Sequence, residues 1–257
     1  MRKLIRALGS LLTILVLTAS VDAGAHPVAD QGVIGQARSA YYNLTTKGFK
    51  GFTATVEPNW KVILADTLTK ENLKVFRAVR FSMVVAANGD VTVRHEVIAN
   101  ATKPNLQPFV NKIDYDVERL ISGFFNTWRI FMVNSPFPEA EQIKIENPGT
   151  DYRLSFNMES GQVMLTMTGD FLITEWNLSG SSGKRMVKPR FQKTVDGFLL
   201  TGYQSVFEPI SAGIMTTLDF NIEYQDVRGM KLPHKVRFSG MHGSEPVEAE
   251  LMFRVNG

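Results

Sequence analysis

The chain has 257 residues, 44% of them hydrophobic and 21% charged, which is typical of a globular protein rather than of a disordered chain. It contains no cysteine, and this excludes thiol catalysis, disulfides, cysteine-ligated zinc and a lipid anchor on an N-terminal cysteine. The formal net charge of +3 comes partly from Arg2, Lys3 and Arg6, so the rest of the chain is nearly neutral. A nearly neutral chain lacks the basic surface that a polyanion requires, and we expect no nucleic-acid partner.

Residues 1–25 have the three parts of a secretory signal peptide. A basic start is followed by a short apolar core at residues 11–17 and by a small-x-small cleavage site that ends at Ala25. The apolar core is well below the ~20 residues that a membrane-spanning helix requires. We therefore expect export to the periplasm, cleavage after Ala25 and a single mature domain over residues 26–257.

Three segments have the apolar spacing of amphipathic helices. Apolar residues recur at intervals of three and four over residues 33–47, with Gly48 as a stop, and again over residues 60–79. A broader stripe of large apolar side chains runs over residues 108–133. We expect a helix in each segment, and each helix must bury its apolar stripe against another element.

Most of the remaining chain has the alternating pattern of β-strands. Residues 52–57 alternate, and a hairpin is indicated over residues 81–97, where Asn88 and Gly89 supply the positive φ values of a tight turn. After about residue 142 the chain consists of alternating runs separated by turns, with no room for a further helix.

Strict alternation gives a sheet one apolar and one wetted face. About ten or eleven antiparallel strands cannot stay flat, because their twist accumulates and the apolar face must be covered. We therefore expect an α+β fold: a strongly curved antiparallel sheet, an unclosed β-barrel, with the N-terminal and central helices covering its concave face. The alternative is a closed barrel with the helices outside, which would need a second apolar sheet face that the alternation does not supply.

The sequence contains no recognisable catalytic or cofactor motif. A nucleophile elbow, a Walker loop, a dinucleotide fingerprint, a His-Glu-x-x-His pair and an EF-hand loop are all missing. Asp114, Asp116 and Glu118 cluster near the expected start of the long helix, where carboxylates stabilise the positive end of the helix dipole, and we favour this interpretation over a metal site. We expect no enzyme activity, no metal and no cofactor.

Candidate ligand-binding residues are those on the apolar side of the predicted strands. His95 and His234 fall on that side, either as satisfied core histidines or as polar anchors inside an apolar cavity. Methionine side chains are flexible and tolerate ligands of varied shape. The predicted lining of a hydrophobic cavity is Phe81, Met83, Val93, His95, Leu154, Phe156, Met158, Leu165, Met167, Leu218, Phe220 and His234.

The two ends of the mature chain carry a resemblance to a known family. An amphipathic helix runs into the strand at residues 48–56, and the later segments 196–198, 222–225 and 229–236 form a strand, a glycine turn, Leu-Pro and a further strand. With the signal peptide and the repeated amphipathic hairpins, this pattern resembles the LolA-type periplasmic lipoprotein carriers over most of residues 30–257. The resemblance implies an unclosed barrel with a helical lid over a hydrophobic cavity that holds acyl chains.

The expected function is that of a monomeric, non-enzymatic periplasmic carrier that binds an acyl-chain lipid or a lipoprotein. The alternative is an envelope sensor or interaction domain, which uses the same fold to bind an envelope membrane protein. Lipid that co-purifies and turns over would favour the carrier, whereas a stable stoichiometric complex with an inner-membrane protein would favour the sensor.

Overall fold

The structure is a computed structural model, and it describes residues 31–65, 69–97, 107–138, 143–147, 149–211 and 213–256. The predicted signal peptide and its cleavage site lie outside the described residues. No helix within these ranges is both long enough and apolar enough to cross a membrane.

Twelve strands form one antiparallel sheet in the order β3-β2-β1-β12-β11-β10-β9-β8-β7-β6-β5-β4. Consecutive strands are neighbours everywhere except at β1, which pairs with β12, and at the two edges, β3 and β4. The strands are β1 (Phe52–Pro58), β2 (Val79–Val85), β3 (Val91–Val97), β4 (Lys144–Glu146), β5 (Tyr152–Met158), β6 (Gly161–Met167), β7 (Ile173–Gly180), β8 (Gly183–Thr194), β9 (Gly197–Pro209), β10 (Thr216–Val227), β11 (Met230–His242) and β12 (Glu245–Asn256).

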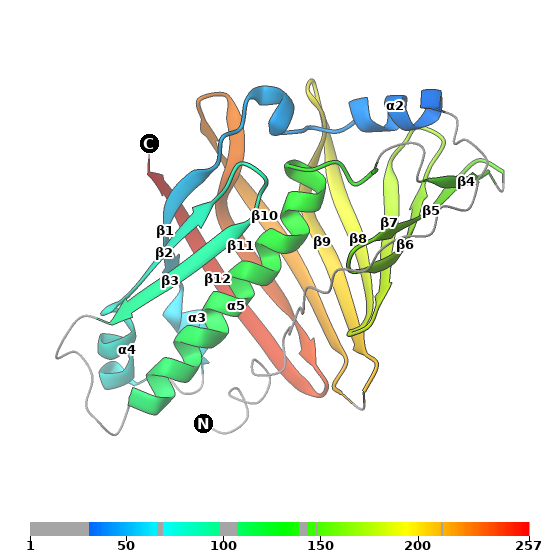
Figure 1. Ribbon diagram of the computed structural model, residues 1–257. Helices are drawn as coiled ribbons and strands as arrows, with labels where there is room; N and C mark the ends of the chain where they lie inside the picture. Colours follow the sequence, from blue (N-terminus) through cyan, green and yellow to red (C-terminus); the bar gives the residue numbers. More distant parts are fainter. Residues whose placement is uncertain are drawn as a thin grey trace.

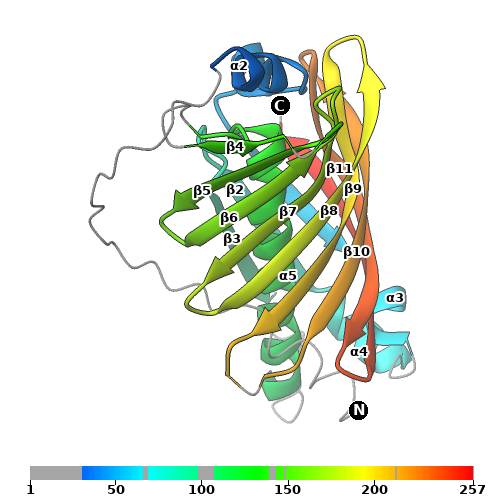
Figure 2. The same ribbon diagram turned by 90° about the vertical axis from the view of Figure 1, so that its right-hand side faces the viewer.

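The sheet curls without closing, and one long helix lies in its concavity. This helix, α5 (Gln107–Met132), runs across the concave side and contacts β3 and β9 (Figure 1). A second view shows the sheet wrapped around α5, with α2 (Gln31–Ser39) across one end (Figure 2). The predicted α+β architecture, an unclosed curved sheet with helices, is confirmed.

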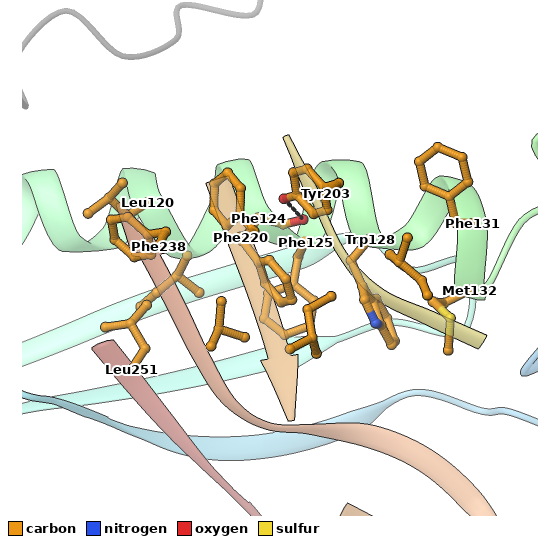
Figure 3. Close-up of a cluster of buried hydrophobic side chains, with 14 of the residues drawn as sticks. Leu120, Phe124, Phe125, Trp128, Phe131, Met132, Tyr203, Phe220, Phe238 and Leu251 are labelled. Carbon is orange, nitrogen blue, oxygen red and sulfur yellow. Dashed lines mark hydrogen bonds between the residues drawn. The ribbon is translucent and has the colours of Figure 1, made fainter. Parts of the chain in front are cut away.

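The apolar stripe of α5 forms the centre of the core. The buried residues of the helix recur every three or four positions, as expected for one face of a helix: Val110, Ile113, Val117, Leu120, Ile121, Phe124, Phe125, Trp128, Phe131 and Met132. The ring of Phe124 packs against those of Tyr203 on β9 and Phe220 on β10 (Figure 3). It also packs against the ring of Phe253 on β12. The concave sheet face and the helix therefore cover each other in the middle of the sheet.

Two predicted helices are shorter in the structure. The segment 33–47 is helical only as α2, and a single 3-10 turn (Thr45–Lys47) follows before Gly48 adopts a left-handed φ of 78°. The segment 60–79 gives α3 (Trp60–Leu64) and α4 (Lys70–Phe76), and its last residue, Val79, begins β2. A single helix was assigned there because the apolar residues of two short helices and of a strand end follow helical spacing.

Tyr41 and Arg38 hold the α2 end of the molecule in place. The Tyr41 hydroxyl donates to the Phe171 carbonyl at 2.6 Å and accepts from the Ile173 amide at 2.7 Å. The guanidinium of Arg38 donates to the carbonyls of Phe137 and Pro138 after α5. The segment from α2 to Tyr41 is thereby bonded both to β7 and to the segment that follows α5.

Candidate ligand-binding face

The concave face of the sheet is mainly apolar. On β6, Val163, Leu165 and Met167 are buried, while Met164 between them is exposed and Thr166 is half-buried, as alternation requires. The same alternation continues on the other strands, which bury Leu154 and Phe156 on β5, Trp176 on β7, Val187 on β8, Leu218, Phe220 and Ile222 on β10, and Leu251 and Phe253 on β12.

Several predicted cavity residues lie on this face but pack against the helices. Phe220 packs on Phe124 of α5, and Phe81 lies 6.1 Å, centroid to centroid, from Trp60 of α3. Met83 and Leu218 are buried on the same face, and Val93 on β3 is partly buried against the core. These residues belong to the helix-covered part of the concave face.

The predicted residues on β5 and β6 belong to strands that lie across α5 from β1, β2 and β3 (Figure 2). Leu154, Phe156, Leu165 and Met167 are buried there. Met158, which ends β5 at the hairpin turn, is 43% exposed, unlike the other predicted residues of these two strands. The buried part of the predicted face therefore reaches Phe156 on β5, two residues before Met158.

His95 lies on the apolar side of β3, as predicted, and contacts α5 through two carboxylates. Its Nδ1 lies 2.8 Å from Oε1 of Glu118, and its Nε2 lies 3.9 Å from Oδ2 of Asp114. Phe81 is its direct neighbour on β2, with ring centroids 5.8 Å apart. His95 is thus part of a polar contact between the β3 edge and α5.

Asp114 is completely buried, and burial raises its pKa to about 7. Both of its carboxylate oxygens lack a hydrogen-bond partner among the described residues. Asp116 is also buried and pairs with Lys112 at 3.3 Å. The helix begins at Gln107 and has no acidic residue in its first turn, so the interpretation of these carboxylates as helix-dipole partners is wrong.

His234 sits at a β-bulge rather than on the apolar side of a regular strand. Lys235 pairs with Glu223 and Pro233 pairs with Tyr224, so no residue of β10 lies directly opposite His234. His234 is half-buried, and its Nδ1 is buried without a hydrogen-bond partner in the described chain. The extra residue interrupts the alternation from which His234 was assigned to the apolar side of its strand.

Two polar residues of the concave face, Arg185 and Trp176, were not predicted as site residues. Arg185 is two residues from the fully buried Val187 on β8 and so shares its face. The run from Lys184 to Arg190 has basic residues on both sides of the strand, so sequence alternation alone gives no signal there. The only usable signal is parity with Val187.

Two hollows on the described part of the molecule lie away from these residues. One, of about 570 Å³, is formed by β1, α3, α4 and the start of β2, and includes Lys61, Arg77 and Arg80. The other, of about 270 Å³, includes Asn221 and Arg237. None of the predicted cavity residues lines either hollow.

Within the described ranges, no group of three or more histidine, aspartate or glutamate side chains is arranged to hold a metal ion. Comparisons of the chain with protein-family models, with curated proteins and with solved structures found no match.

Proposed function

We propose that the protein is a non-enzymatic periplasmic carrier that binds the acyl chains of a lipid or lipoprotein on the concave face of its sheet. The observation that carries this proposal is that the apolar concave face continues over β5, β6 and β7, beyond β8, whose Phe191 ring packs on Phe131 of α5. Acyl chains are apolar, as is the buried stripe of α5, so either can pack against this face and shield it from water.

The free-energy argument favours long chains as cargo. Transfer of one methylene from water to an apolar surface contributes about 0.8 kcal/mol, so a chain of ordinary membrane-lipid length gains on the order of 10 kcal/mol. That gain is large enough to offset the local displacement of aromatic side chains or of a helix end. The entropic cost of ordering the bound chain reduces this free-energy gain.

The resemblance to LolA-type carriers supports the same proposal at the level of the fold. An unclosed curved sheet with a helix in its concavity is the architecture that this resemblance implies. Because fold similarity does not fix function, the proposal depends on a direct search for ligand.

The experiment is native mass spectrometry with lipid extraction on protein purified from the periplasm without detergent. A bound mass that matches an acyl-chain species, and that exchanges with added lipid, is the expected result. A ligand-free mass, together with failure to take up a fluorescent fatty acid, would contradict the proposal.

A second candidate, an interaction domain, is favoured by exposed apolar side chains at one end of the sheet. Ile210, Ile214 and Met215 lie in the loop between β9 and β10, and Met241 lies near the end of β11. A stable stoichiometric complex with a membrane protein of the envelope, captured by crosslinking at Met215, is the result that would favour this candidate over the carrier.

A further inference from the structure

Arg185 places a cation on the apolar concave face. In the antiparallel ladder, Arg185 lies directly opposite Leu178 on β7 and directly opposite Phe207 on β9. Directly opposite residues project on the same side of a sheet, so the guanidinium side chain shares its face with two apolar neighbours. Val187, the next residue on that side of β8, is fully buried.

This arginine has no partner among the described residues. It makes no hydrogen bond and no ion pair there, and burial lowers its pKa from the ordinary value. Arg190, on the outer side of the same strand, instead makes two hydrogen bonds to Asp219, at 2.6 and 2.9 Å. Since an unpaired guanidinium among apolar groups is costly, Arg185 stands out from the other strand arginines.

Trp176 supplies a second unused donor beside it. Its Nε1 is buried and has no hydrogen-bond partner within the described structure. Trp176 lies opposite Val187, and Leu178 opposite Arg185, so Trp176 and Arg185 are diagonal neighbours on the β7–β8 ladder. An indole N–H and a guanidinium can only donate, so both require an acceptor.

The missing group must therefore be an acceptor that carries negative charge. The guanidinium geometry fits a carboxylate or a phosphate, each of which can accept two parallel hydrogen bonds. Arg185 is half-buried rather than sealed, and it lies near the β7–β8 turn, so a head group can reach it from the rim of the sheet. From there the apolar face continues along β8 toward Val187.

We propose that Arg185 and Trp176 bind the anionic head group, a carboxylate or a phosphate, of an acyl-chain lipid whose chain lies on the concave face. This inference rests on the proposed carrier function and adds its ligand class: anionic lipids are preferred over neutral lipids with the same chain. Arg185 selects a negatively charged head group, and Trp176 orients that head group by donating one further hydrogen bond to it.

The test measures binding of palmitate, palmitoyl lysophosphatidate and monopalmitoylglycerol by calorimetry to the mature protein. These three ligands have the same chain and differ in the head group: a carboxylate, a phosphate and a neutral glycerol. We expect Arg185→Met to weaken binding of at least one anionic ligand by about tenfold or more, the size of a lost charge-assisted contact, and to change monopalmitoylglycerol binding less than about twofold. The anionic ligand whose affinity falls more identifies the preferred head group.

Lys184→Met is the matched control, because Lys184 precedes Arg185 on the same strand but is exposed on the opposite side. We expect it to leave all three affinities unchanged. Trp176→Phe keeps an aromatic ring without the N–H, and we expect it to weaken the same anionic ligand by roughly threefold to tenfold.

The stability of the ligand-free variants separates binding from a structural role. Removing an unpaired cation from an apolar face should leave the melting temperature of Arg185→Met unchanged or raise it. A lower melting temperature, an equal loss of affinity for charged and neutral ligands, or unchanged affinity for both anions would overturn the inference. Wild-type protein that binds none of the three ligands would overturn the carrier function as well.

Discussion

The Nδ1 atom of His95 lies 2.8 Å from Oε1 of Glu118, and this contact joins the β3 edge of the sheet to the helix in its concavity. Asp114, one helical turn earlier, faces the other ring nitrogen of His95 at 3.9 Å. The helix that covers the concave face is therefore attached at this edge by contacts between ionisable side chains.

Asp114→Asn should remove a pH dependence of stability. Burial raises the pKa of Asp114 to about 7, whereas an unfolded chain has an aspartate pKa of about 3.9. Between these values the folded state holds a proton that the unfolded state has released, so stability falls as pH rises from about 4 to about 7. At about pH 8 we expect the asparagine variant to be more stable than the wild type by roughly 1–4 kcal/mol.

Urea unfolding at about pH 5 and about pH 8 measures this effect. His95→Gln is the control, because it removes the facing imidazole and keeps the Asp114 carboxylate. An asparagine variant with the same difference between the two pH values as the wild type would show that Asp114 is not the titrating group.

His242→Gln should reduce the loss of stability at acid pH. His242 is buried on β11, its Nδ1 lies 2.7 Å from the Thr216 hydroxyl, and burial lowers its pKa. The unfolded state therefore takes up a proton more readily, and stability falls as pH drops through the ordinary histidine pKa of about 6.5. Glutamine keeps a hydrogen-bonding partner for Thr216 without titrating, so we expect a smaller acid loss in thermal melts below about pH 6.5.

Phe156→Asp and Arg153→Asp test which side of β5 faces inward. Phe156 is buried on the concave face, and Arg153 is exposed on the outer face. We expect the first change to cost roughly 3 kcal/mol or more, or to prevent folding, and the second to cost about 0.5 kcal/mol or less. Similar losses of unfolding free energy in both variants would show that the assigned sides are wrong.

Tyr41→Phe should loosen the α2 end. The change removes a donor to Phe171 and leaves the buried Ile173 amide without its acceptor. We expect a loss of about 1–3 kcal/mol and faster hydrogen exchange at the Ile173 amide. Tyr115→Phe, at an exposed tyrosine of α5, is the control and should change neither quantity.

The architecture was predictable from the sequence because sheet alternation and the stripe of α5 are both long-range periodic signals. The hairpin at Asn88 and Gly89, the helix at 107–132 and the unclosed curved sheet all follow from these patterns. The short strand β4 did not, because three residues are too few to show a period.

The candidate site was less predictable, for reasons that lie in particular residues. A bulge at His234 interrupts the alternation, and alternation alone does not locate a bulge, although Pro233 stands directly beside it. The partnership of His95 with Glu118 joins residues from a strand and a helix, which periodicity within one element does not detect. Arg185 is one of several basic residues in its strand, and only the pairing register separates it from its outward neighbours.

The pairing of β1 with β12 also determines the order in which the molecule can be completed. Every other strand pair is a hairpin or meander contact between consecutive segments, which forms without closing a long loop. The β1–β12 pair joins residues as far apart as Thr53 and Asn256, so the β1–β2–β3 unit can join the main sheet only after β12 has been made. Until then both β1 and β11 present open edges, and during synthesis this interval is the one in which the chain depends most on protection from aggregation.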